Sequence, residues 1–182
     1  MFSLLNFPAR RRLEVLRPRL HRLARAWCHD AALADDLVQD TLTKAWTHSG
    51  QLRDEQALEG WLFSILNNVW RDHLRARREH LDVDELDELI LSDAPGPEQA
   101  YASRQTAQRV RGAIARLPLG QRQVVTLVDL EECSYAEVAR ILEVPVGTVM
   151  SRLSRARQAL KLHLMQQTDA PADNRTRLRR VK

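Results

Sequence analysis

The chain has little of what secreted, disulfide-stabilised or membrane-spanning proteins need. Its 182 residues include only two cysteines, Cys28 and Cys133, without paired spacing, so a disulfide framework is not expected and a reducing cytosol is the simplest setting. No apolar run approaches the roughly 20 residues of a membrane span. The N-terminal MFSLLNFPARRR lacks the apolar stretch and cleavage site of a signal peptide. We therefore expect a cytoplasmic protein without membrane insertion.

The sequence also lacks the pattern of a metal centre or a catalytic site. Cys28 and His29 are adjacent but have no second ligand pair, so we expect a surface thiol beside a surface histidine. The 6 histidines are scattered, and the carboxylates fall on one predicted helix face or in a linker. An enzyme acting on nucleic acid would need such groups clustered. We predict no cofactor, no metal ion and no enzymatic activity.

Strand-like alternation is scarce, and apolar residues recur at helical spacing instead. One such face consists of Leu13, Leu16, Leu20, Leu23 and Trp27. Pro18 interrupts it, so either the helix kinks there or a new helix begins with Pro18 in its first turn. Asp30 can cap a second helix that extends to Trp46, and a third begins near Leu58. The pattern predicts an all-α protein.

The charge is distributed unevenly, although the net charge is only +4. Between Asp82 and Glu98 there are seven acidic residues and no lysine or arginine, and Pro95-Gly96-Pro97 breaks this segment. Such a composition is typical of a linker. Basic clusters on both sides of it suggest two nucleic-acid contacts. We expect two small helical domains at 10–81 and 101–165, a flexible acidic linker at 82–100 and a disordered basic tail at 166–182.

The most informative segment runs from Cys133 to Leu160 and has the pattern of a helix-turn-helix. Ser134 followed by Glu137 is a capping box that starts a short helix, and Pro145 prevents its continuation. The second helix buries a stripe that includes Val149 and Leu153. The alternative is an ordinary amphipathic helix with a solvated arginine face. The capping box, the helix-breaking Pro145 and the small Gly147 occur together, which favours a DNA-reading helix. Its polar face suits base edges and phosphates and consists of Thr148, Met150, Ser151, Arg152, Ser154 and Arg155.

Two blocks of the chain, the first with two motif helices and the second in the C-terminal half, resemble the extracytoplasmic-function (ECF) sigma factors, the smallest class of bacterial transcription initiation factors. DDLVQDTLTKAW (35–46) is similar to that family's E-D-L-V-Q-x-x-F-x-x-A-W helix. WLFSILNNVWRDHLRARR (61–78) resembles its W-L-x-x-I-x-x-N-x-x-x-D-x-x-R helix, with Asn68, Asp72 and Arg75 at the matching steps. Residues 117–160 resemble its C-terminal domain almost throughout. The resemblance implies an alternative sigma factor that directs promoter-specific initiation through the minus-ten and minus-thirty-five elements.

The resemblance also implies protein partners. The domain at 10–81 would bind the β′ clamp helices of core RNA polymerase, whose β subunit completes the contact. The residues would be Asp36, Gln39 and Asp40, since acidic and amide groups can pair with arginines of a coiled coil. The alternative is a solvated helix face with acidic residues near the helix N-terminus. It would explain Asp36 but not why Gln39 and Asp40 extend the same patch. An anti-sigma factor is expected to cover these polymerase-binding faces.

For DNA, the resemblance divides the contacts between the two domains. Asn68 matches the family's asparagine near an extruded base of the minus-ten element, and an amide can both donate and accept hydrogen bonds. Phosphates would be bound by Arg71, Arg75, Arg77 and Arg78. Trp61 is expected in the core, whereas Trp70 could be either core or exposed to a base.

The polar face of the helix-turn-helix would read the minus-thirty-five element. Met150 departs from the lysine or arginine common in the family at this position. This removes a contact worth about 1–3 kcal/mol of discrimination and favours an apolar contact such as a thymine methyl.

The main rival is a stand-alone helix-turn-helix regulator of the response-regulator output type. That class would place an α/β receiver or a ligand-binding domain before the motif. Residues 1–100 show no alternating strand pattern, so the sequence favours the sigma factor.

Overall fold

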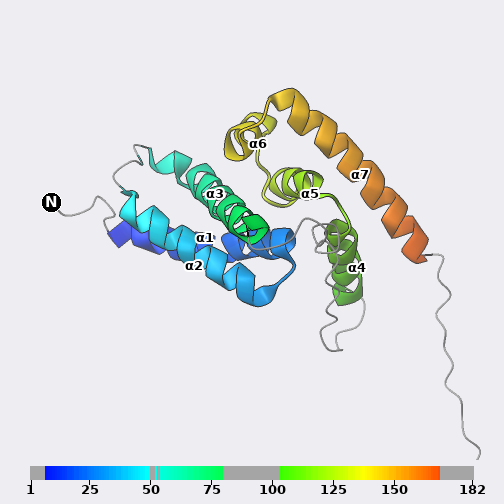
Figure 1. The fold of residues 1–182 in the computed structure, drawn as a ribbon, viewed down its shortest axis with the longest axis horizontal. Helices are drawn as coiled ribbons and strands as arrows, with labels where there is room; N and C mark the ends of the chain where they lie inside the picture. Colours follow the sequence, from blue (N-terminus) through cyan, green and yellow to red (C-terminus); the bar gives the residue numbers. More distant parts are fainter. Residues whose placement is uncertain (1–6, 50–51, 53, 80–102, 169–182) are drawn as a thin grey trace, which may run out of the picture.

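A computed structural model describes residues 7–49, 52, 54–79 and 103–168 (Figure 1). This part of the chain contains helices and no strand, which confirms the all-α prediction. The α-helices are α1 Phe7–Cys28, α2 Ala31–Thr47, α3 Leu58–Glu79, α4 Ser103–Ala115, α5 Leu119–Val125, α6 Tyr135–Leu142 and α7 Val146–Thr168. The predicted linker at 82–100 and residues 169–182 of the predicted tail lie outside the described residues.

The first half of the structure is a bundle of α1, α2 and α3. α1 runs through Pro18 as one helix, so no new helix begins there. The proline is exposed, while Leu13 and Leu20 on either side of it are buried in the same core. That shared burial outweighs the lost backbone hydrogen bond, which costs about 3 kcal/mol. Asp30 caps α2 as predicted, because its side chain accepts a hydrogen bond of 3.0 Å from the Leu33 N–H.

The second half holds the helix-turn-helix, formed by α6 and α7. The predicted capping box between Ser134 and Glu137 is present at the start of α6. α6 ends at Leu142, and the capping residue Glu143, with a left-handed φ of 55°, turns the chain before Pro145. The predicted core helix before the motif is α5, continued by a π-helical turn over Thr126–Leu130. In α7 the residues that face the core are Val149, Leu153 and Ala156.

The two halves pack against one another and share one apolar core. α3 lies beside α6, and the C-terminal end of α1 lies beside α5 (Figure 1). The indole N–H of Trp27 donates to Thr126 Oγ1 over 3.0 Å, and Arg122 Nη1 donates to the Trp27 carbonyl over 2.8 Å. All three of these side chains are buried. The chain therefore adopts a closed arrangement in which its first and second halves are in direct contact.

Cys28 and His29 are half-buried, which corrects the expectation of a surface pair. His29 has a φ of 59° and makes the sharp turn from α1 to α2. The Cys28 thiol donates to the Asp30 carbonyl over 3.1 Å. Both side chains are therefore partly covered at this turn.

Within the described ranges, no helix is both long enough and apolar enough to cross a membrane. Across the same residues, no group of three His, Cys, Asp or Glu side chains could hold a metal ion.

Candidate nucleic-acid interface

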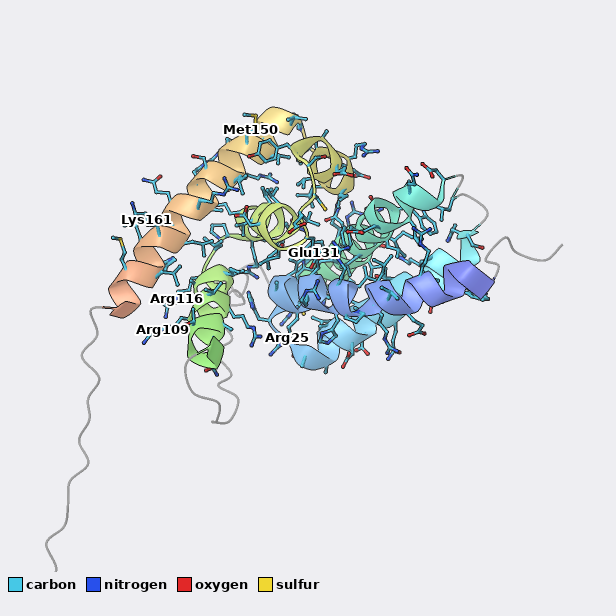
Figure 2. The ribbon with its side chains drawn as sticks, turned by 180° about the vertical axis from the view of Figure 1, so that it is seen from behind. Arg25, Arg109, Arg116, Glu131, Met150 and Lys161 are labelled. Atoms are coloured by element: carbon cyan, nitrogen blue, oxygen red, sulfur yellow. The ribbon has the colours of Figure 1, made fainter. Side chains whose placement is uncertain are left out.

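The polar face of α7 points away from the core, as Figure 2 shows for Met150 near the N-terminal end of the helix. Met150 is 54% exposed, and Ser151, Ser154 and Arg155 are exposed beside it. The Arg155 guanidinium folds back onto Ser151, with 3.3 Å from Nε to the carbonyl oxygen. The face therefore offers short polar groups, one thioether and an arginine held on the helix surface.

Arg152 is placed differently from the other arginines of α7, because its side chain is half-buried. Its guanidinium lies over Gly120 at the start of α5, where a Cβ would come within 3.1 Å of Arg152 Cζ. Thr148, at the first turn of α7, is also half-buried. Nothing in the sequence pattern points to Gly120, because the two residues meet only when α5 and α7 pack together.

The α3 residues expected at DNA differ in their surroundings. Asn68, Arg75 and Arg77 are exposed, whereas Arg71 is half-buried and its Nη1 lies 2.6 Å from Glu143 Oε2. Arg78 lies in α3, but its side chain is outside the described part.

The aromatic residues of α3 belong to the core. Trp70 is buried and stacks on His73 with ring centroids 5.7 Å apart. This settles its role in favour of packing. Trp61 is half-buried and packs against the core, as expected.

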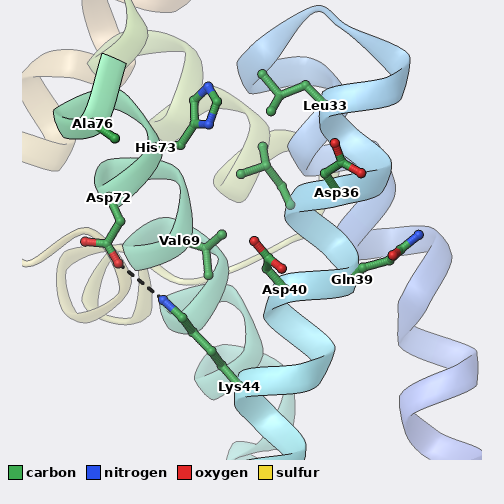
Figure 3. Close-up of a pocket in the computed structure, with 10 residues that line it drawn as sticks. Leu33, Asp36, Gln39, Asp40, Lys44, Val69, Asp72, His73 and Ala76 are labelled. Carbon is green, nitrogen blue, oxygen red and sulfur yellow. Dashed lines mark hydrogen bonds and ion pairs between the residues drawn. The ribbon is translucent and has the colours of Figure 1, made fainter. Parts of the chain in front are cut away.

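Asp36, Gln39 and Asp40 are exposed on α2 and line a cavity of about 550 Å³ between α2 and α3 (Figure 3). Asp72 of α3 faces them across this cavity and pairs with Lys44, with 3.2 Å between Nζ and Oδ2. The cavity has an apolar side formed by Leu33, Leu37, Val69 and Ala76. Carboxylates above an apolar wall suit a cation with an aliphatic stem, such as an arginine side chain.

Buried charges occur where the two halves meet. The Glu131 side chain is fully buried, and its carboxylate lies 2.6 Å from Arg19 Nε and 3.1 Å from Arg22 Nη2. Arg122 donates to the backbone carbonyls of Trp27, Ala115 and Leu117. Burial lowers the pKa of Arg122 to about 10, so it stays protonated at neutral pH. Burial, with a smaller effect of the nearby arginines, lowers the pKa of His29 to about 4.

A helix-turn-helix whose second helix keeps an open polar face is typical of DNA-binding transcription factors. A family model described as Sigma-70 region 2 matches residues 13–80, and one described as Sigma-70, region 4 matches residues 107–160. The chain is 38% identical over 141 residues to the ECF RNA polymerase sigma factor SigM of Mycobacterium tuberculosis, covering 78% of this chain and 69% of that protein. It is 36% identical over 141 residues to the RNA polymerase sigma-H factor of Pseudomonas aeruginosa, covering 72% and 73%.

Among solved structures, the chain is similar to the sigma factor RpoE of Bartonella quintana in complex with the anti-sigma factor NepR. The TM-score is 0.74 at 31% identity, and the match covers 86% of this chain and 96% of the other. The chain belongs to the ECF RNA polymerase sigma factors. It is an alternative sigma factor, which directs core RNA polymerase to specific promoters. The rival reading as a stand-alone regulator is not favoured.

Proposed function

We propose that three surfaces of this sigma factor divide its contacts. The exposed side of α2 docks on the β′ clamp helices of core RNA polymerase, with the β subunit contacting other parts of the chain. α3 opens and holds the minus-ten element, and the polar face of α7 reads the minus-thirty-five element. The observation that carries the proposal is that α7 keeps this face open while its apolar residues are buried.

On α2, the docking contact is electrostatic at its rim and apolar at its centre. Asp36 and Asp40 attract basic side chains, and Gln39 supplies hydrogen bonds in both directions. Val69 and its apolar neighbours in the cavity accept the stem of a long side chain. The same surface suits an anti-sigma factor that competes with polymerase. In support, the similar RpoE of Bartonella quintana was solved with NepR, and the sigma factor CnrH was solved with the cytosolic domain of CnrY.

On α3, the exposed amide of Asn68 is available to hydrogen-bond an unstacked base. Arg71, Arg75, Arg77 and Arg78 follow on the same helix and bind the phosphates of the opened strands, a contribution that weakens with salt. The bond-forming chemistry of transcription belongs to the polymerase, so this chain needs no catalytic group, metal or cofactor of its own. We place its action in the cytoplasm because it works with RNA polymerase there.

On α7, base edges are read by side chains near the N-terminal end, where a recognition helix contacts the major groove. The contacts are Thr148, Met150, Ser151, Arg152, Ser154 and Arg155. Met150 offers an apolar surface that suits a thymine methyl.

The first test is co-elution of the purified protein with bacterial core RNA polymerase, because it requires no knowledge of the promoter. We expect a one-to-one complex that is weakened at least about ten-fold by D36R together with D40R. E14R, which reverses an exposed carboxylate on α1, is the matched control. Absence of a complex, together with direct binding of the free protein to duplex DNA, would instead support the stand-alone regulator.

The second test separates DNA reading from polymerase binding. R152A together with R155A is expected to abolish selection of specific duplexes from a random library by the polymerase complex. Co-elution with core polymerase should be unchanged, since both residues lie on α7 whereas the proposed β′ contact lies on α2. K161A, an exposed cation further along α7 (Figure 2), is the control. Equal loss of both activities would contradict the proposed division.

A further inference from the structure

A bidentate ion pair ties the reading helix α7 to the segment that follows α5. Arg157 Nη2 donates to Asp129 Oδ1 over 2.5 Å, and Arg157 Nε donates to Asp129 Oδ2 over 3.2 Å. Two parallel hydrogen bonds between a guanidinium and a carboxylate fix the relative orientation of the two groups as well as their distance. The pair therefore restricts the rotation of α7 about its own axis.

Asp129 projects from a well-anchored base, the π-helical turn Thr126–Leu130. The Glu131 N–H donates to the Thr126 carbonyl, five positions earlier, over 3.1 Å, and the side chains of Thr126 and Leu127 are buried. A π-helical turn holds more residues than an α-helical one, so its side chains point in directions that a continuous α-helix would not give. This turn presents the Asp129 carboxylate to α7.

Arg157 lies on the side of α7 that carries part of the reading face. Met150 is seven positions earlier and Ser154 three, which places the three side chains on one side of the helix. The guanidinium is nevertheless held by Asp129, and the Tyr135 side chain at the start of α6 also interacts with it. Arg157 thus links α7 to both the π-helical turn and α6.

A second contact fixes the same helix from another direction. The Arg152 guanidinium lies over Gly120, where an added Cβ would come within 3.1 Å of Arg152 Cζ. Arg152 and Arg157 are five positions apart and so project from different sides of α7. Gly120 lies at the start of α5, whereas Asp129 lies in the turn that continues it. Two contacts on different sides of α7 fix its rotation as well as its tilt.

We propose that Asp129 is a positioning residue for reading the minus-thirty-five element. Acting through Arg157, it holds α7 at the rotation that directs Met150 and its polar neighbours toward base edges. This inference rests on the proposed reading role of α7. The pair is partly exposed, with 53% exposure for the Arg157 side chain and 33% for that of Asp129, so it contributes little to stability. Its effect is therefore expected in base discrimination.

The experiment uses the complex of the full chain with core RNA polymerase and measures its preference for selected over random duplexes. We expect D129N and R157K each to reduce this preference at least about five-fold, which corresponds to the loss of one well-aligned base contact. R157K keeps the charge but loses the bidentate geometry. E132Q is the matched control, because it removes one negative charge from an exposed residue three positions away, and it should leave the preference unchanged.

A double-mutant cycle tests whether the two residues act as one unit. D129A together with R157A should reduce the preference no more than either single substitution does, because the first substitution already releases the helix. All variants should keep a urea unfolding midpoint close to that of the wild type.

Two results would overturn the inference. If Arg157 bound phosphates directly, R157K would keep the preference, and D129N would tighten binding to every duplex with a steeper salt dependence. If the pair only stabilised the fold, D129N and R157K would lower the urea midpoint while leaving the preference unchanged. Failure of the wild-type complex to select any duplex would instead refute the proposed function, and this inference with it.

Discussion

The hydrogen bond between Trp27 and Thr126 offers a direct measure of how firmly the two halves are joined. Trp27 is 1% exposed and Thr126 is 0% exposed, and the indole N–H donates to the threonine hydroxyl over 3.0 Å. T126V keeps the shape of the side chain but removes the acceptor. The buried indole N–H then has no partner in its place, which costs about 1–3 kcal/mol.

The assay is urea unfolding, followed by tryptophan fluorescence and circular dichroism. With a slope of about 2 kcal/mol per molar urea, a loss of about 2 kcal/mol lowers the unfolding midpoint by about 1 M. T41V is the control, because Thr41 is equally buried and its hydroxyl donates to the Leu37 carbonyl over 2.6 Å. In the variant that carbonyl still accepts its backbone hydrogen bond within the helix, so T41V should change the unfolding midpoint little.

The result that would refute this reasoning is an equal midpoint for T126V and T41V. If the halves separated before either unfolded, the Trp27 indole would bind water in the open state and the penalty would vanish. A shift specific to T126V therefore requires that the closed packing persists in solution until the protein unfolds.

Three further predictions concern single residues. G120A places a methyl group 3.1 Å from Arg152 Cζ, so we expect the guanidinium to move and promoter binding to weaken by several-fold. G112A is the control, because its added Cβ has open space around it, and it should leave promoter binding unchanged. Burial lowers the pKa of His29 to about 4, against about 6.5 in an unfolded chain. The contribution of the neutral His29 to stability is therefore fully present above pH 6.5 and falls as the pH drops toward 4. H29N, in which asparagine tolerates the positive φ, should make the urea midpoint depend less on pH. S134A removes the cap of α6 and should cost about 1 kcal/mol in the same unfolding assay.

Local features were well predicted because short-range rules govern them. The capping box at Ser134, the cap at Asp30 and the turn before Pro145 depend on residues within four positions of one another. The helical stripes followed from periodicity, and the pattern from Cys133 to Leu160 predicted the helix-turn-helix. Local rules do not decide whether α1 passes through Pro18, because the outcome depends on the packing of residues on both sides of the proline.

The sequence by itself determined the helical class and the helix-turn-helix, because periodicity and capping are local properties of the chain. The order of the two sigma regions and the family followed from the resemblance of its motifs to those of the ECF sigma factors. Only the tertiary structure decided that the halves close on one another. Glu131 meets Arg19 across 112 positions, and Asn67 meets Ile141 across 74. No local pattern encodes such pairs, since they form only when buried side chains of distant helices satisfy one another in a shared core.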